Sequence, residues 1–389
     1  MRTQPLAAVV VAVAALAAIA PAASAGPADL GAELRELVRM PGGPAGAIVV
    51  VQRPDGRTVY TAGVRNTKTK APLRATDHMR IASAAKAFSA AVALSLVRKG
   101  RLSLDDTIAL RLPELPAAWG SVTLRQALHH TSGLPDFSRS PGFQEAVVDD
   151  LHGRPAPRTM LRFIADEPLE FRPGSRYRYS NTDNFVVALM AEAATGRDYT
   201  SLLASEVTRP LRLRATSLPR GAGMPAPYIH GYQPDPPNAP EDVSTLISAA
   251  WSWASGGIVS TPADLTSFVR GYVGARLFGR AVQRRQMTFR PGGSEPIGPG
   301  RNSAGLGIFR YRTQCGTVYG HTGNTSGYTQ FMAAAKDGRR SVTVSINAQI
   351  TNRSTGDRLA AFRRLRKVEG RAVCEALATK REATREWGR

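Results

Sequence analysis

The sequence predicts an α+β fold in which an antiparallel sheet is flanked by N- and C-terminal helices and carries a largely helical inserted lobe. Strand-like runs occur near both ends of the chain, within residues 45–64 and 306–348. Between them, residues 101–290 contain helix patterns joined by loops rich in proline and glycine. Strands from both ends can share one sheet if the middle forms its own lobe, so we expect two lobes with a cleft between them.

The first 25 residues are a predicted secretory signal peptide. Residues 6–20 are an unbroken run of small apolar side chains, and Ala23-Ser24-Ala25 fits the usual cleavage pattern. The run is too short and too rich in alanine for a good membrane span, and no later stretch is apolar enough to cross a bilayer. No cysteine follows the cleavage site, which argues against a lipid anchor. We therefore expect residues 26–389 to form a single secreted domain in the cell-wall space.

The N-terminal elements follow from simple periodicities. Residues 29–38 carry apolar side chains on one helical face. Residues 45–52 and 57–64 are strand-like runs, and Pro54-Asp55-Gly56 between them provides the turn of a hairpin. Residues 84–99 form a predicted helix that is apolar on nearly every side, which is typical of a helix buried in the core.

Helix signals dominate the middle of the chain. Thr123 and Thr261 are hydroxyl caps that precede apolar runs, and Gly196 ends another. The predicted helices cover residues 124–129, 159–165, 183–194 and 199–206, with a further helix starting at residue 262.

The C-terminal part returns to strand-like patterns and then forms one amphipathic helix, over residues 357–367 and 372–377. The predicted strands are residues 306–311, 317–321, 329–335 and 341–348. These boundaries predict an α/β lobe made of residues 26–82 and 291–389, and a mostly helical lobe made of residues 83–290.

The chain is strongly basic, with 51 Lys and Arg against 30 Asp and Glu and a formal net charge of +21. Its arginines are scattered rather than grouped. This pattern fits a compositional preference for arginine, and it also fits attraction to anionic wall polymers. No nucleic-acid recognition motif is present, and an exported protein has little access to nucleic acid, so we expect no such partner.

Two cysteines, Cys315 and Cys374, are the whole complement of the chain. Two buried free thiols are one alternative, but an oxidising compartment favours a single disulfide. Cys315 lies between two predicted strands and Cys374 lies on the C-terminal helix. The disulfide would therefore hold that helix against the sheet.

The segment Ile81-Ala82-Ser83-Ala84-Ala85-Lys86 is the first candidate for chemistry. Residues three apart share a helical face, so the Ser83 hydroxyl is expected beside the Lys86 amine. Desolvation by small apolar neighbours lowers the pKa of an amine, and a neutral amine can accept the serine proton. Ser-x-x-Lys also occurs by chance, with the serine as a helix cap and the lysine exposed, so the pair needs further context.

Two later motifs supply that context. Tyr179-x-Asn181 lies before a predicted helix, and His321-Thr322-Gly323 is expected at the end of a strand. Ser-x-x-Lys, Tyr-x-Asn and His-Thr-Gly in this order resemble the serine penicillin-recognising enzymes, in the branch of class C β-lactamases and exported D-Ala-D-Ala carboxypeptidases. A histidine at the first position of the His-Thr-Gly motif resembles the actinobacterial carboxypeptidases, since β-lactamases of this branch usually carry a lysine there. Three further segments resemble this family, namely residues 128–134, 172–175 and 256–264. The resemblance as a whole covers residues 45–348.

The resemblance implies a β-lactamase/transpeptidase-like fold and assigns roles to matching residues. Ser83 is the expected nucleophile, Lys86 the base, and Tyr179 the group that relays a proton to the leaving nitrogen. Asn181 is expected to bind the substrate amide carbonyl and to hold Lys86. The backbone N–H groups of Ser83 and Asn324 would form the oxyanion hole. Asn324 stands where a close carboxypeptidase carries a hydroxyl residue, which leaves the exact substrate open.

The remaining expected residues concern the substrate carboxylate. His321 and Thr322 would recognise it or tune the neighbouring tyrosine, and Gly323 would let the substrate backbone lie close to the strand edge. A histidine is partly charged near neutral pH. A free carboxylate also favours an arginine, for which Arg310 and Arg312 are candidates.

These residues predict an exported serine D-Ala-D-Ala carboxypeptidase that acts on peptidoglycan stem peptides and binds penicillin. A β-lactamase, an esterase, a D-amino-acid amidase of the same family, and a catalytically silent β-lactam- or wall-binding protein are the alternatives. We expect a monomer without a cofactor. We also expect no metal site, because His129 and His130 are adjacent and no acidic residue has ligand spacing from them. Trp251 and Trp253 are candidates for the cleft wall or for buried packing.

Overall fold

The computed structural model describes residues 29–234 and 238–378. The predicted signal peptide therefore lies outside the described residues. Within these two ranges, no helix is long and apolar enough to cross a membrane.

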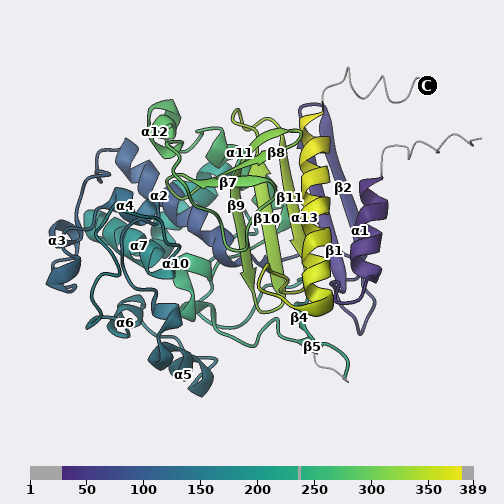
Figure 1. Ribbon diagram of the computed structural model, residues 1–389, viewed down its shortest axis with the longest axis horizontal. Helices are drawn as coiled ribbons and strands as arrows, with labels where there is room; N and C mark the ends of the chain where they lie inside the picture. Colours follow the sequence, from purple (N-terminus) through teal and green to yellow (C-terminus); the bar gives the residue numbers. More distant parts are fainter. Residues whose placement is uncertain (1–28, 235–237, 379–389) are drawn as a thin grey trace, which may run out of the picture.

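A seven-stranded antiparallel sheet forms the centre of the fold, with the order β2-β1-β11-β10-β9-β8-β7 (Figure 1). The strands are β1 (Gly46–Arg53), β2 (Gly56–Gly63), β7 (Arg301–Ala304), β8 (Phe309–Thr313), β9 (Gly316–Thr325), β10 (Tyr328–Ala334) and β11 (Ser341–Ile346). Strands from the two ends of the chain meet where β1 pairs with β11, with Ala47 opposite Ile346. The predicted single sheet is confirmed.

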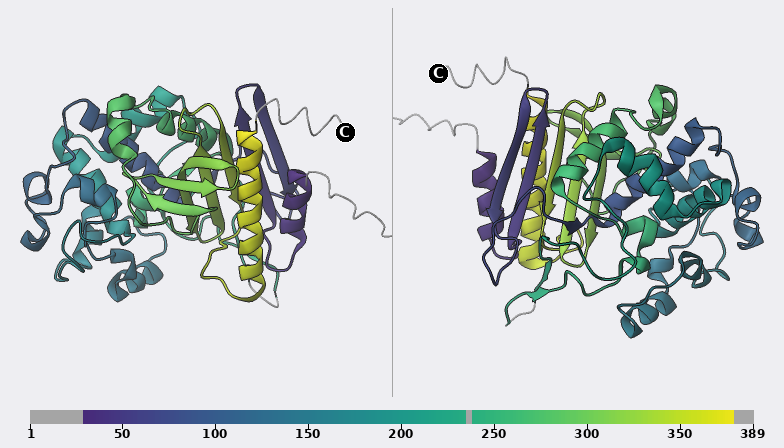
Figure 2. Two further views of the ribbon diagram at one scale, coloured as in Figure 1. Left: turned by 45° about the horizontal axis from the view of Figure 1, so that its top comes forward. Right: turned by 180° about the vertical axis from the view of Figure 1, so that it is seen from behind.

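Both faces of the sheet are covered, because successive side chains of a strand point to opposite sides. On β1, Ala47 and Val49 pack under α1 (Leu30–Arg39) and α13 (Gly356–Leu377). Ile48 belongs to the core on the other face, which α11 (Pro262–Val273) covers. Figure 2 shows α1 and α13 on one side of the sheet and the helices of the middle segment on the other.

The middle of the chain is largely helical and is built around α2 (Ala85–Arg98), which packs against α7 (Asn181–Thr195). Twelve of the fourteen residues of α2 are buried, which confirms the prediction of a central buried helix. The other elements are α3 (Ile108–Arg111), α4 (Leu124–Leu128), α5 (Pro141–Asp149), α6 (Pro157–Arg162), α8 (Tyr199–Leu203), α9 (Arg209–Leu211), α10 (Trp253–Gly256), α12 (Gly279–Gln286), and the short strands β3 (Met79–Arg80), β4 (Tyr232–Gln233), β5 (Glu241–Asp242) and β6 (Val259–Ser260).

Near the C-terminus, one predicted strand was wrong in its bounds and another strand was missed. The strand predicted at residues 306–311 begins only at Phe309, because Gly307 (φ +63°) turns the chain against Ala90 of α2, where a Cβ would lie 2.1 Å from the Ala90 Cβ. The edge strand β7 was missed because its residues are polar. The predicted C-terminal amphipathic helix is confirmed as α13, which is continuous through residues 368–371.

The disulfide between Cys315 and Cys374 is present, with Cα atoms 5.1 Å apart. Cys315 lies in the turn between β8 and β9, and Cys374 lies in the last turns of α13. The crosslink therefore holds the C-terminal helix against the sheet, as predicted, and the alternative of two free thiols is excluded.

We expect the double variant Cys315→Ser/Cys374→Ser to fold with reduced stability. A crosslink over a sequence separation of 59 residues contributes about 4 kcal/mol in the chain-entropy model. Urea unfolding should show this loss, and a reductant should lower the stability of the wild type but not that of the double variant. A loss below about 1 kcal/mol would contradict a stabilising role of this crosslink.

Candidate active site

Ser83 and Lys86 lie side by side at the start of α2. Ser83 is in a short 3-10 turn, Ala82–Ala84, that precedes the helix, and Ala82 has a left-handed backbone (φ +49°). The Lys86 Nζ lies 3.1 Å from the Ser83 Oγ, 2.7 Å from the Asn181 Oδ1 and 2.9 Å from the carbonyl oxygen of Ser255. A neutral amine can donate to the two carbonyl oxygens and accept the serine proton through its lone pair.

The environment of Lys86 favours this neutral form. Its side chain is fully buried, and burial lowers its pKa to about 7, although Asp136, Glu295 and Asp183 raise it in part. Among the described residues no carboxylate lies within ion-pair distance of its amine. The structure therefore combines a nucleophilic hydroxyl with an amine that changes charge near neutral pH.

Tyr179 lies next to this pair, in the loop that leads into α7. The Lys86 Nζ is 5.0 Å from the centre of its ring, and only 6 % of the side chain is exposed. Burial raises the pKa of Tyr179 well above its usual range, and the neighbouring Ser83 hydroxyl lowers it in part. The phenol therefore carries its proton at neutral pH, and in the described structure no group forms a geometric hydrogen bond with its hydroxyl.

Asn181 is the first residue of α7, and three neighbours determine its orientation. Its Oδ1 accepts from Lys86, while its Nδ2 donates to Ser138 Oγ (2.9 Å) and to Asp136 Oδ2 (3.2 Å). The amide thus holds the lysine, as expected. We had not predicted Asp136 or Ser138, and the only sequence signal for them was their position directly after the loop of residues 131–135.

Strand β9 runs directly past the Ser83 turn. Its pairing with β8 ends at Gly320, so residues 321–325 are paired only with β10 and present their other edge to the site. A Cβ at Gly323 would lie 2.5 Å from the Ile81 carbonyl oxygen and 2.7 Å from the Ala84 nitrogen. The motif His321-Thr322-Gly323 therefore lies inside the strand and not at its end, because the ladder with β10 continues to Thr325.

His321 and Thr322 do not line the cavity. Both are fully buried, the His321 Nδ1 lies 2.5 Å from the Thr322 carbonyl oxygen, and the Thr322 hydroxyl donates to Pro296. Burial lowers the pKa of His321 to about 3, so the ring is neutral and not partly charged as we had expected. These two side chains therefore contact the protein backbone and do not face the cavity.

Arg310 and Arg312 are also outside the cavity. The Arg310 Nε donates to Ser303 Oγ, and its guanidinium stacks on Phe289 at 4.6 Å. The arginines that do line the cavity are Arg139 and Arg353. Sequence reasoning missed them because they lie in irregular segments of a chain in which arginine is abundant everywhere.

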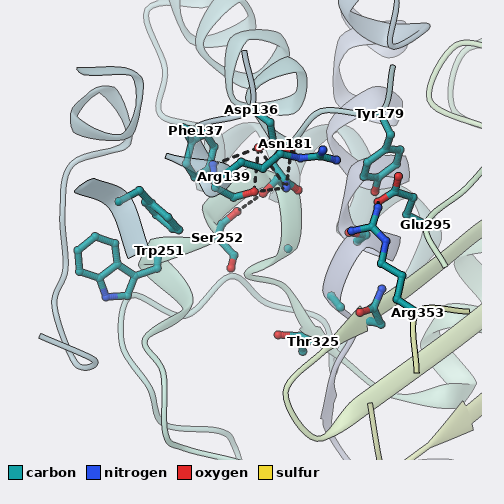
Figure 3. Close-up of a pocket in the computed structure, with 17 residues that line it drawn as sticks. Asp136, Phe137, Arg139, Tyr179, Asn181, Trp251, Ser252, Glu295, Thr325 and Arg353 are labelled. Carbon is teal, nitrogen blue, oxygen red and sulfur yellow. Dashed lines mark hydrogen bonds and ion pairs between the residues drawn. The ribbon is translucent and has the colours of Figure 1, made fainter. Parts of the chain in front are cut away.

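The cavity in front of Ser83 has a volume of about 390 Å³ and two unlike sides (Figure 3). One side is aromatic, with Phe137 and Trp251, and Phe143 packs edge-on against both rings. Trp253 is not part of it, because it packs against Phe185 and Tyr199.

The opposite side is polar and consists of Tyr179, Glu295 and Arg353. The Arg353 Nη2 lies 3.3 Å from the Glu295 Oε2. Asn324, from β9, completes the lining together with Thr325. Within the part of the chain that the structure describes, no group of three or more His, Cys, Asp or Glu side chains could hold a metal ion.

Comparison with known proteins matches residues 33–365 to the family model described as Beta-lactamase. The chain is 24 % identical over 318 residues to "Penicillin-binding protein 4*" of Bacillus subtilis, which covers 78 % of this chain and 68 % of that protein. It is 26 % identical over 219 residues to "D-alanyl-D-alanine-carboxypeptidase/endopeptidase AmpH" of Escherichia coli. That match covers 54 % of this chain and 52 % of AmpH, so the chain spans about half of that relative.

A solved structure is similar over nearly its full length. It is a D-stereospecific amidohydrolase from Streptomyces sp., with a TM-score of 0.73, 27 % identity, and coverage of 86 % of this chain and 97 % of that chain. The predicted β-lactamase/transpeptidase-like fold is thereby confirmed.

We expect Gly323→Ala to impair the site without unfolding the protein. The added methyl group would clash with backbone atoms of the Ser83 turn, so β9 and the serine must separate. Displacements of this size cost roughly 100-fold in rate, which kcat/KM for an activated ester would measure. Gly370→Ala in α13 is the matched control, because its Cβ meets nothing within 4 Å. Equal activity of both variants would contradict the close approach.

Proposed function

Because this chain belongs to the beta-lactamase family of serine hydrolases, we propose that it is an exported D-alanyl-D-alanine carboxypeptidase that forms an acyl-enzyme at Ser83. The observation that carries the proposal is the buried Lys86 amine, which lies 3.1 Å from the serine hydroxyl and has a pKa of about 7. We further propose that it works as a monomer without a cofactor.

In the proposed acylation, the Ser83 oxygen attacks the carbonyl carbon of the scissile peptide bond and its proton moves to Lys86. The backbone N–H groups of Ser83 and Asn324 stabilise the negative charge on the carbonyl oxygen. The leaving amine then takes a proton from the neutral phenol of Tyr179, which is replenished from Lys86. Water repeats the sequence on the ester and releases the acyl product.

The leaving amine must lie close to Tyr179, because Tyr179 is the proposed donor of its proton. Tyr179 lies on the polar side of the cavity together with Glu295 and Arg353, and the aromatic side lies opposite. We propose that Arg353 takes the terminal carboxylate of a stem peptide, the role we had expected of Arg310, and exchanges its contact with Glu295 for it. The acyl part would then lie against the aromatic side.

A D-amino-acid amidase is the second candidate. Glu295 is a carboxylate on the cavity wall, where it would attract the free ammonium group of a D-amino-acid amide. The similar Streptomyces structure is named a D-stereospecific amidohydrolase. A β-lactamase or esterase would use the same serine and lysine. The intact Ser83, Lys86 and Tyr179 disfavour a silent binding protein.

Wild-type protein should be labelled covalently by a fluorescent penicillin and should release D-alanine from a stem-peptide mimic. Ser83→Ala should lose the label and at least about 1,000-fold in kcat, because it removes the nucleophile. A long-lived label favours the peptidase and a rapidly lost one favours a β-lactamase. Hydrolysis of D-amino-acid amides without D-alanine release would favour the amidase. An unlabelled wild type with no activity on any of these compounds would refute the serine mechanism.

The rate of acylation should rise with pH. The reactive form of Lys86 is the neutral amine, whose fraction increases as the pH rises through about 7, so kcat/KM for an ester should climb and then level off above that value. Lys86→Arg should lose both activity and this rise, because a guanidinium stays charged. A rate independent of pH in the wild type would contradict Lys86 as the base.

A further inference from the structure

His130 holds the segment around Tyr179 at three points, although the proposed reaction gives it no role. Its carbonyl oxygen accepts from the Arg178 N–H at 2.8 Å, and the Ser180 N–H lies 3.4 Å from its Nδ1. Its ring packs on the Tyr179 ring, with centres 4.5 Å apart and planes inclined by 34°. The residues before and after the tyrosine and the tyrosine itself thus all contact this one residue, Arg178 through its backbone carbonyl and the other two through its ring.

His130 is in turn held by Asp183, in the first turn of α7. The Asp183 Oδ2 lies 2.8 Å from the His130 Nδ1, and the two side chains are 0 % and 4 % exposed. His130 also has a left-handed backbone (φ +56°), a conformation that a residue with a side chain retains only when its surroundings hold it there. The hydrogen bond to Asp183 and the contacts with residues 178–180 provide these restraints.

The geometry around the His130 Nδ1 indicates where the proton lies. A neutral imidazole has one nitrogen that donates and one that accepts. The Ser180 N–H donates to Nδ1 at 3.4 Å, which favours this nitrogen as the acceptor. The Asp183 oxygen at 2.8 Å can then be a hydrogen-bond partner only if it carries a proton and donates. An ionised Asp183 would require a proton on Nδ1, which would face the Ser180 N–H.

The surroundings agree with an uncharged pair. Burial raises the pKa of Asp183 well above its usual range, opposed by the Ser132 hydroxyl and by Lys86 and reinforced by Asp136. Burial also lowers the pKa of His130 to about 3. The charged groups that act on the histidine are Lys86, Asp136 and Glu295, and the Tyr177 ring meets its edge at 6.1 Å. Lys86 lowers the pKa of His130, whereas the two carboxylates raise it.

We propose that Asp183 is a neutral carboxylic acid that donates a hydrogen bond to neutral His130, and that this uncharged pair is the positioning element for Tyr179. The inference rests on the proposed role of Tyr179 in proton transfer. It also bears on the base, because an ionised Asp183 would raise the pKa of Lys86. A protonated Asp183 avoids this and leaves the amine reactive at neutral pH.

Replacement of Asp183 by asparagine tests whether the pair with His130 is neutral or ionic. Asp183→Asn retains a donor to Nδ1, so kcat/KM should stay within about fivefold of the wild type, with an unchanged pH profile. Asp183→Ala removes the donor and should lose about 10- to 100-fold in kcat with little change in KM. If the pair were ionic, Asp183→Asn would remove its negative charge and would change the pH profile of kcat/KM, and that result would overturn the proposal.

Two spectroscopic measurements on folded protein decide the protonation independently of activity. Nitrogen NMR at neutral pH should show His130 neutral with its proton on Nε2. Infrared spectra should show a carboxylic-acid carbonyl band that Asp183→Asn removes and that the matched control Asp198→Asn, at an exposed helix cap, leaves in place. A doubly protonated His130 or the absence of this band would refute the neutral pair. An inactive wild type would refute only the proposed function, since both spectra would still report on the pair.

Discussion

The desolvation of one lysine amine is the constraint on which the rest of the site depends. An exposed lysine is charged at neutral pH and cannot accept a proton, whereas burial of Lys86 lowers its pKa to about 7. A buried charge without a carboxylate partner is costly, so the site has to stabilise the neutral amine with dipoles instead of counter-charges. The carbonyl oxygens of Asn181 and Ser255 do so, and they belong to two helices that are distant in sequence.

This requirement explains the uncharged character of the groups behind the cavity. The ring of His321 is neutral because it too is buried, and burial raises the pKa of the Tyr179 phenol, which is neutral already, still further. In our inference Asp183 belongs to the same set. By contrast, Arg353 and Glu295 form a partly exposed ion pair on the cavity wall, which in our proposal exchanges partners with a substrate. In the proposed mechanism, the buried groups transfer protons and the partly exposed ion pair contacts the substrate.

Close backbone packing brings these groups together. Gly323 lets β9 lie against the serine turn, and Gly307 lets the segment before β8 lie against α2. Neither of these two contacts leaves space for a Cβ. The left-handed residues Ala82 and His130 are held in strained conformations. Such strain is retained because the surrounding packing over-determines it.

The sequence by itself determined the local features: the buried character of α2, the hairpin of β1 and β2, and the proximity of Ser83 and Lys86, because periodicity and three-residue spacing act within one element. The motif order also led to the correct fold. Only the tertiary structure decided which distant side chains meet. Asp136 pairs with Asn181 and His130 pairs with Asp183, and the members of each pair are dozens of residues apart in the sequence. Likewise, Arg353 and not Arg310 lines the cavity. No local pattern encodes such pairs, because packing of separate elements creates them.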